Sequence, residues 1–181
     1  MKTTKTKLEG CFIYQPDVFN DSRGYFFESY NRNTLKEILP QQTRFIQDNE
    51  SFSCRGVLRG LHYQIGDFAQ AKLVRVVLGE VLDIAVDLRK DSDTYLQYIS
   101  VELTGDNKKQ LFVPRGFAHG FVVLSETATL AYKCDNYYSK IHERGIIYSD
   151  TTLNIDWKLP TSSLIISEKD QNLPTLENAE I

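Results

Sequence analysis

The chain has 181 residues, of which 41% are hydrophobic and 25% are charged. This composition excludes a wholly disordered or fibrous chain, and the length fits one domain better than two. Twenty-four acidic against 21 basic residues give a net charge of −3, which disfavours a protein that binds nucleic acid by neutralising phosphates. No apolar run is long enough to span a membrane, and residues 1–10 lack the apolar core of a secretion signal. We therefore expect a cytoplasmic protein with neither a membrane nor a nucleic-acid partner.

The first predicted element is a short helix over 33–39, where Thr34 and Glu37 have capping-box spacing and Pro40 prevents continuation. In 80–89, Leu82, Ile84, Val86 and Leu88 share one face of a predicted strand, whereas Asp83, Asp87 and Arg89 lie on the other. Similar patterns predict strands over 57–64, 72–78, 98–103, 110–113, 117–124 and 127–134. Many short strands at this spacing predict a sandwich or barrel.

The C-terminal part of the chain becomes polar after an apolar run over 164–166. No linker interrupts residues 10–160, so we predict a single domain over 1–181 with a tail after about residue 174. We expect this tail to pack on the barrel and then to fray.

The sequence gives little support for a metal site or for disulfide bonds. Metal-binding barrels of this kind usually gather several histidines, often as an H-x-H pair, but Gln64 stands two residues after His62. His119 is the only other plausible ligand, since His142 lies in a charged loop. Three cysteines without CxxC spacing argue against a zinc site or a disulfide framework and favour buried thiols. We expect no catalytic metal.

A strand histidine inside a barrel can instead serve as a general base, because neutral imidazole accepts protons near pH 7. It then needs an orienting carboxylate, for which Asp83 and Asp170 are both candidates. Tyr132, on the apolar face with Ala128 and Leu130, could return a proton from the opposite side, or it could be an ordinary core tyrosine.

Other polar residues allow two interpretations each. A local anion site or solvated surface charge would equally account for the basic residues Arg23, Arg59, Lys72 and Arg115. Tyr137 and Tyr138 could stack on a planar base or cover the barrel mouth. The residues alone therefore predict a β-barrel with a candidate His/Tyr pocket.

Eight blocks of the sequence carry a family resemblance. They are DSRGYFFESYN (21–31), QDN (47–49), GVLRGLHYQ (56–64), QAKLVRVVLGEVLDIAVDLRKDSDTY (70–95), QLFVPRGFAHGF (110–121), YKCDNYYS (132–139), IDW (155–157) and SEKD (167–170). In these blocks and in their order, the chain closely resembles the dTDP-4-dehydrorhamnose 3,5-epimerase family. Asp93 and the Ser139-Lys140 pair depart from residues common in the family, away from the implied chemistry.

The resemblance implies an all-β, cupin-type jelly roll with short peripheral helices, usually a homodimer, with no metal or other cofactor. It also implies a substrate, dTDP-4-dehydro-6-deoxyglucose, and a product, dTDP-4-dehydro-L-rhamnose, in nucleotide-sugar synthesis for surface polysaccharide. A residue supplied across a dimer interface could complete the pocket.

Roles for individual residues follow from the same resemblance. His62 resembles the base, Asp170 its carboxylate partner and Tyr132 the acid. Lys72 is our first choice for stabilising the oxygen charge, and with Arg59 and His119 it would line the sugar. The remaining implied substrate contacts are Arg23, Glu28, Gln47, Asp48, Asn49, Tyr138, Glu143 and Lys169.

Two alternatives stay open at this point. The closest is an epimerase that inverts only C3 or only C5 of a related sugar, because the shared motifs do not separate these enzymes. A cupin that binds nucleotide sugars without catalysis would keep the arginines and Tyr138, but it would have no need for His62, Tyr132 and Asp170 together.

Overall fold

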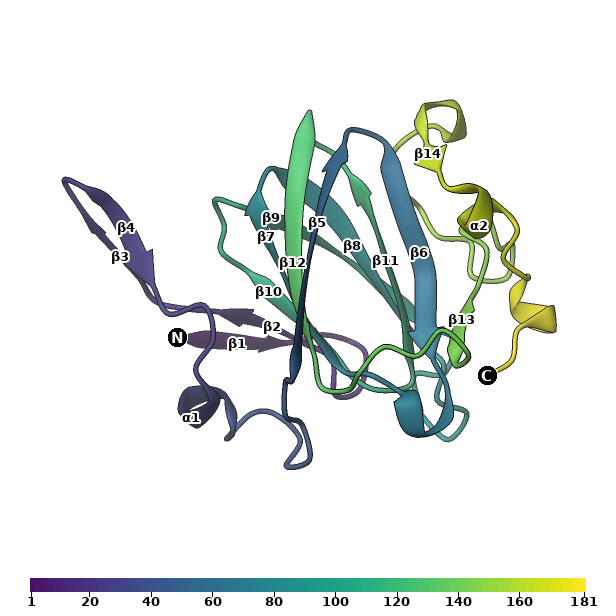
Figure 1. Cartoon of the computed structure of the whole chain (residues 1–181), viewed down its shortest axis with the longest axis horizontal. Helices are drawn as coiled ribbons and strands as arrows, with labels where there is room; N and C mark the ends of the chain where they lie inside the picture. Colours follow the sequence, from purple (N-terminus) through teal and green to yellow (C-terminus); the bar gives the residue numbers. More distant parts are fainter.

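The structure, a computed structural model, describes residues 1–181. It consists of two facing β-sheets and a separate hairpin (Figure 1). The first sheet has the order β1-β2-β10-β7-β12-β5. Its strands are β1 (Lys2–Lys5), β2 (Phe12–Gln15), β10 (Gln110–Val113), β7 (Lys72–Leu78), β12 (Thr127–Cys134) and β5 (Gln47–Cys54).

The second sheet has the order β13-β6-β11-β8-β9, and β14 pairs with β6 in parallel. Its strands are β13 (Glu143–Gly145), β6 (Val57–Gln64), β11 (Phe117–Val123), β8 (Glu80–Asp87), β9 (Tyr98–Thr104) and β14 (Ile165–Ile166). The predicted all-β, cupin-type jelly roll is confirmed. Six of the seven predicted strands match within one residue at each end, and the seventh, over 80–89, ends two residues earlier in the structure.

The main core lies between the two sheets, where apolar side chains from both inner faces meet. Val74, Leu111 and Leu130 come from the first sheet, and Val81 and Phe117 from the second. The predicted inward face of 127–134 is confirmed, because Ala128 and Leu130 are in this core and Tyr132 packs against it.

Strand β8 is buried on both faces, and its two predicted faces are confirmed. Leu82, Ile84 and Val86 face outward into a second core, which the C-terminal part of the chain covers with residues such as Trp157. Asp83 and Asp87 are therefore fully buried rather than solvated. Asp83 thereby points toward the space between the sheets.

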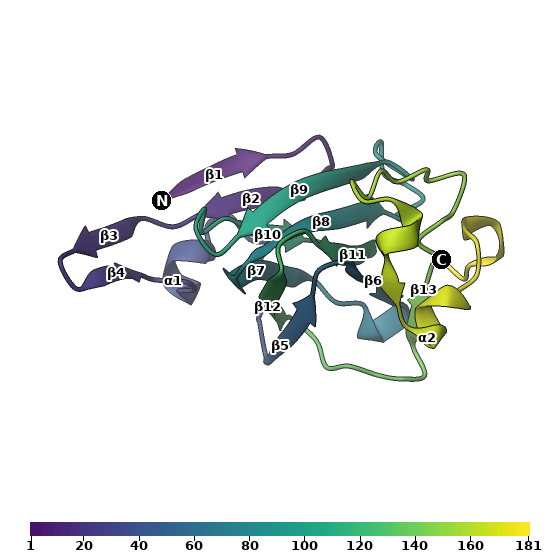
Figure 2. The same cartoon turned by 90° about the horizontal axis from the view of Figure 1, so that it is seen from above.

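The N-terminal region carries two peripheral elements. Strands β3 (Val18–Asp21) and β4 (Gly24–Phe27) form a hairpin that extends away from the barrel in both views (Figures 1 and 2). Helix α1 spans only Arg32–Leu35, and its N-cap is Asn31, whose side chain accepts from the Asn33 N–H. The predicted capping box is thus wrong, because Thr34 already lies inside the helix. Leu35 and Leu39 pack on the outer face of the first sheet.

The C-terminal region runs along the outside of β6 and β13 (Figure 1). It contains the 3₁₀ turns η2 (Thr161–Ser163) and η3 (Leu176–Asn178) and helix α2 (Glu168–Gln171). A further 3₁₀ turn, η1 (Gly66–Phe68), follows β6. The predicted packing of this tail on the barrel is confirmed, and its fraying stays a prediction. The Leu176 N–H donates to Asp150 Oδ2 at 2.8 Å, and the Tyr63 hydroxyl donates to the Glu180 carbonyl at 2.7 Å.

Two smaller observations complete the fold. Cys11 and Cys134 are buried as predicted, but Cys54 is exposed at the end of β5. None of the helices is long and apolar enough to cross a membrane.

Candidate active site

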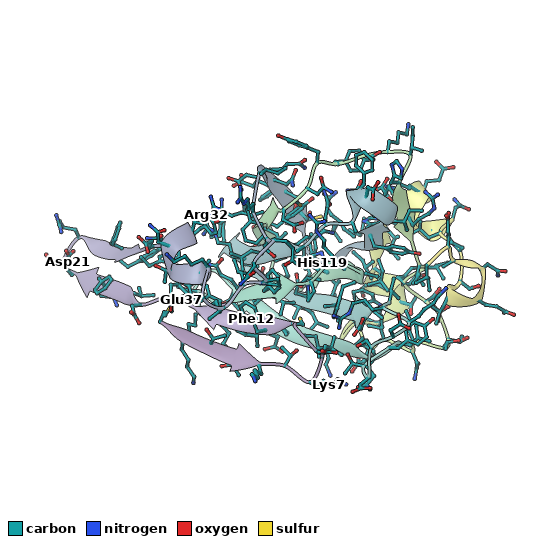
Figure 3. All side chains as sticks on the ribbon, turned by 90° about the horizontal axis from the view of Figure 1, so that it is seen from below. Lys7, Phe12, Asp21, Arg32, Glu37 and His119 are labelled. Carbon is teal, nitrogen blue, oxygen red and sulfur yellow. The ribbon has the colours of Figure 1, made fainter.

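A cavity of about 540 Å³ lies between the two sheets. A second hollow, of about 250 Å³, shares His62, Lys72 and Tyr132 with it, so the two form one continuous site. Figure 3 places His119 within the barrel, far from Asp21 at the hairpin tip. The first part is also lined by Arg59, His119, Lys169 and Asp170, and the second by Gln47, Asn49, Tyr138 and Glu143.

A bulge in β6 turns two functional side chains to the same face. Arg59 and His62 are three residues apart, and a regular strand would point them in opposite directions. His62 pairs with His119 and Arg59 with Phe121, so β6 has one more residue than β11 between these pairs. Gly60 occupies the bulge at φ 124°, and a Cβ there would lie 2.6 Å from the Gly120 Cα. Both Arg59 and His62 consequently line the cavity.

His62 forms a close pair with Asp170. Its Nε2 lies 2.8 Å from Asp170 Oδ1, and the Gly60 N–H donates to Oδ2 at 3.1 Å. Burial alone would raise the Asp170 pKa, but the hydrogen bond and charge of His62, with the Gly60 N–H, hold that pKa below its usual value. An ionised carboxylate only accepts hydrogen bonds, so Nε2 carries the proton and neutral His62 keeps its lone pair on Nδ1.

His119 forms a second pair, with Asp83 on the neighbouring strand β8. Its Nε2 lies 2.9 and 3.1 Å from the two carboxylate oxygens. The sequence left Asp83 and Asp170 as alternative partners for a strand histidine. The structure gives each carboxylate to a different histidine, Asp170 to His62 and Asp83 to His119.

Lys72 and Tyr132 lie next to each other on β7 and β12, with the Lys72 Nζ 5.9 Å from the centre of the Tyr132 ring. Burial lowers the pKa of Lys72, and the nearby Cys134 and Asp83 oppose this shift. Burial also raises the pKa of Tyr132, with a further contribution from Cys134. The phenol therefore keeps its proton at neutral pH and can act as an acid.

Three side chains from separate segments meet at the rim. Glu143 Oε2 accepts from the Tyr138 hydroxyl at 3.1 Å and from the Lys169 Nζ at 2.7 Å. Burial would raise the Glu143 pKa, but its contacts with Lys169 and Tyr138 outweigh this and lower the pKa. Glu143 thereby links the rim of β13 to α2 and to the loop that carries Tyr138.

Three implied contact residues do not line the cavity of this chain. Side chains on β5 alternate, so Gln47 and Asn49 face inward, whereas Asp48 faces outward and pairs with Lys133 at 2.8 Å. Arg23 pairs with Asp21 on the hairpin at 2.6 Å, and Glu28 accepts from Asn31. Their roles in binding stay predictions.

Residues that the sequence analysis considered for other sites lie elsewhere. Arg115 is not part of a cavity cation cluster, because its Nε donates to the buried Asp135 at 2.9 Å. His142 stacks on Phe68 outside the cavity, and Tyr137 is exposed. No three His, Cys, Asp or Glu side chains lie close enough to share a metal ion. The expectation of a metal-free enzyme stays a prediction.

One residue that the sequence analysis missed is Ser53, whose Oγ accepts from Arg59 Nε and Nη2, both at 3.2 Å. A signal for it was present, because inward positions 47, 49, 51 and 53 of the segment QDNESFSC are all uncharged and polar. This period of two indicates a strand that lines a polar cavity.

The arrangement suits proton transfer at carbon. His62, fixed by Asp170, belongs to the second sheet, and Tyr132 belongs to the first, so a base and an acid approach the cavity from opposite walls. Lys72 supplies an ammonium donor for a developing oxygen charge, and His119, whose Nε2 is paired with Asp83, adds a donor at Nδ1 in its imidazolium form.

Comparisons with known proteins show which proteins the chain is similar to. The family model described as dTDP-4-dehydrorhamnose 3,5-epimerase matches residues 5–178. A dTDP-4-dehydrorhamnose 3,5-epimerase from Shigella flexneri is 49% identical over 172 residues, 95% of this chain and 94% of that protein. The crystal structure of the Elizabethkingia anophelis enzyme of the same name has 53% identity and a TM-score of 0.93, covering 98% of this chain and 97% of that one.

Two further solved structures are complexes with dTDP-sugars. The dTDP-6-deoxy-D-glucose-3,5-epimerase of Legionella pneumophila, in complex with dTDP-4-keto-L-rhamnose, has 45% identity and a TM-score of 0.93 over 98% of this chain and 93% of its own. A more distant 3'-monoepimerase from Streptomyces bikiniensis, in complex with dTDP-quinovose, has 28% identity and a TM-score of 0.86 over 95% and 86% of the two chains.

Proposed function

Because this chain belongs to the dTDP-4-dehydrorhamnose 3,5-epimerase family and is an epimerase, we propose that it converts dTDP-4-dehydro-6-deoxy-D-glucose to dTDP-4-dehydro-L-rhamnose by inverting C3 and C5. The observation that carries this proposal is the His62–Asp170 pair on one wall of the cavity, facing Tyr132 on the other. Inversion requires that a proton leave one face of a carbon and return to the opposite face. Two walls with a base and an acid meet that requirement.

His62 removes the proton. A ketone at C4 acidifies the hydrogens on C3 and C5, since the carbanion delocalises onto oxygen as an enolate. The Nδ1 lone pair of His62 accepts the proton, and Asp170 stabilises the imidazolium that forms. The partial exposure of His62 lets this proton exchange with solvent.

Lys72 and His119 stabilise the enolate oxygen. Both line the cavity that His62 and Tyr132 share. A donor aimed at a developing oxyanion is worth about 3–4 kcal/mol of barrier in other enzymes. No electron leaves the sugar in this sequence of steps, so the proposed reaction needs no redox cofactor.

Tyr132 returns a proton to the opposite face. Its buried hydroxyl is protonated at neutral pH, as its raised pKa requires. Donation leaves a phenolate close to Lys72, whose ammonium group stabilises it. His62 releases its proton to solvent and the Tyr132 phenolate takes one up, after which the same cycle at the second carbon completes the double inversion.

The nucleotide occupies the adjoining hollow. We place the thymine against Tyr138 and within reach of Gln47 and Asn49, because these residues line that hollow. Arg59 and Lys169 lie on the sugar side and contact the diphosphate.

A second copy of the chain supplies the contacts that this one lacks. The hairpin that carries Arg23 leaves Phe19 and Phe26 exposed at 64% and 71%, and the outer face of β5 exposes Phe52 at 64%. Such apolar surface marks a protein interface. We propose a homodimer in which the hairpin of one copy lies against the other and brings Arg23 and Glu28 to its diphosphate. A monomer at micromolar concentration in sedimentation experiments would contradict it.

The alternative is inversion at one carbon only. It has support from the likeness of this fold to the 3'-monoepimerase structure. Proton NMR with dTDP-4-dehydro-6-deoxyglucose in deuterated water separates the two, because each inverted carbon takes up deuterium. We expect exchange at both C3 and C5 with formation of the L-rhamno product. Exchange at one carbon supports the mono-epimerase, and exchange at neither contradicts both.

A further inference from the structure

Arg59 is held by a neutral hydrogen-bond acceptor, whereas Arg89 and Arg115 are held by carboxylates. Arg89 donates to the carboxylate of Asp87, and Arg115 to that of Asp135. Arg59 lines the cavity and is exposed, but it forms no ion pair, and its hydrogen bonds go to the hydroxyl of Ser53. The guanidinium is thus held in place while its charge stays uncompensated.

The geometry leaves one edge of the guanidinium free. Nε and Nη2 both donate to Ser53 Oγ at 3.2 Å, which uses two of the five N–H groups. The two N–H groups of Nη1 and the second one of Nη2 have no partner in the chain. These form the end edge of the fork, which matches two oxygens of a phosphate group.

Ser53 is itself well fixed. It is 5% exposed and pairs with Ala128, one residue from the end of the ladder between β5 and β12. A carboxylate at this position would hold Arg59 at least as firmly, but it would cancel the charge. A neutral acceptor instead preserves the attraction for an anionic ligand.

We propose that Ser53 is a positioning residue for anion binding: its hydroxyl orients Arg59 without neutralising it, so that the free edge faces the diphosphate of the nucleotide sugar. The proposal rests on the proposed function for the identity of this ligand. It assigns to Ser53 an effect on binding and none on the proton transfers.

Titration calorimetry with dTDP, an unreactive probe, tests the proposal. We expect Ser53→Ala to weaken dTDP binding about 5- to 10-fold, because Arg59 keeps its charge but loses both hydrogen bonds that orient it. Ser53→Asp should weaken it about 100-fold, because an ion pair replaces a free cation. Thymidine binding and kcat should change less than about 2-fold in Ser53→Ala. Ser100→Ala, at an exposed position of edge strand β9, is the matched control.

A double variant gives the decisive comparison. If Ser53 acts through Arg59, Ser53→Ala adds nothing to the loss caused by Arg59→Ala. Additive losses, or a Ser53→Asp variant that binds dTDP like the wild type, overturn the proposal. Ser53→Cys keeps the size of the side chain but accepts poorly, and it should repeat the loss if Ser53→Ala does not fold.

Failure of the proposed function has a separate signature. If the wild type binds pyrophosphate but not dTDP, and Ser53→Ala weakens that binding, the positioning role holds and the nucleotide assignment fails. If dTDP binds and only Arg59→Ala weakens it, the positioning role fails and the proposed function is untouched.

Discussion

The two histidine–aspartate pairs of the cavity differ in exposure and in how they are built. The His62 side chain is 27% exposed and Asp170 5%, whereas His119 is 7% exposed and Asp83 0%. His119 and Asp83 come from neighbouring strands of one sheet. His62 and Asp170 are 108 residues apart, and Asp170 stands on a helix of four residues.

This difference separates two uses of the same chemical pair. A base that turns over must reach both substrate and solvent, which suits the more exposed His62. A donor that stabilises one oxygen benefits from being fixed and dry, which suits His119. We therefore assign proton transfer to the His62–Asp170 pair and oxyanion stabilisation to the His119–Asp83 pair.

The largest expected effect is that of His62→Asn. Without the imidazole of His62 the cavity loses its proposed base, and we expect exchange at C3 and C5 to fall by about 10³-fold or more. Deuterium incorporation followed by NMR measures it, and circular dichroism checks the fold. Exchange at the wild-type rate would remove His62 from the role of base.

Tyr132→Phe should uncouple exchange from inversion. The base remains, so deuterium still enters the substrate, but formation of the inverted product should slow about 10²-fold because its acid is missing. Separate rates for wash-in and product formation, from one NMR time course, provide the measurement. Equal slowing of both rates would mean that Tyr132 also assists deprotonation.

Replacing the carboxylates tests the two pairs against each other. Asp170→Asn should lower kcat about 10²-fold, because the amide no longer fixes the His62 tautomer or stabilises the imidazolium. Asp83→Asn should lower kcat only about 10-fold, since the new amide can donate to Nε2 and leave the proton of neutral His119 on Nδ1 as a donor. Steady-state kinetics of both variants decide the order, and a reversed order would reverse our assignment of the two histidines.

The lowered pKa of Asp170 makes the stability of the fold depend on pH. Asp170 has a folded-state pKa below its unfolded value, so its stabilisation is complete above the unfolded pKa of about 3.9 and is lost as pH falls through the folded value. Urea unfolding at pH 5 and pH 3 should show a larger loss in the wild type than in Asp170→Asn. Identical losses would show that His62 does not stabilise the ionised form.

Tyr63→Phe is expected to have the smallest effect. It removes the hydrogen bond from the buried phenol to the Glu180 carbonyl, beside the strand that carries His62. We expect a loss of about 1 kcal/mol in the free energy of unfolding, measured with urea, and little change in kcat. A large fall in kcat at full stability would make the C-terminal segment part of the catalytic apparatus.

Local patterns predicted the barrel but not its surroundings. The alternation in β6, β7 and β12 gave their bounds, because a strand repeats its environment every second residue. For β8 the alternation gave the two faces but not the burial of both, since the cover on the outer face comes from residues about 70 positions later. Strand β5 also escaped prediction, because its inward side chains are polar.

The candidate site likewise has features that the sequence predicted and features that it could not. The family resemblance identified His62, Tyr132 and Asp170, and the structure brings all three to one cavity. Alternation alone could not place Arg59 and His62 on one face, because a bulge at Gly60 reverses it. Nor could it pair Asp83 with His119, since that contact depends on the register of two strands.

The most direct test compares His62→Asn with His119→Asn in deuterated water, with dTDP-4-dehydro-6-deoxyglucose as substrate and dTDP binding as the check on an intact site. We predict that exchange at C3 and C5 is abolished in His62→Asn and persists in His119→Asn at a rate reduced about 10- to 100-fold. The opposite pattern, with exchange surviving the loss of His62 and lost with His119, would contradict the assignment of His62 as the base.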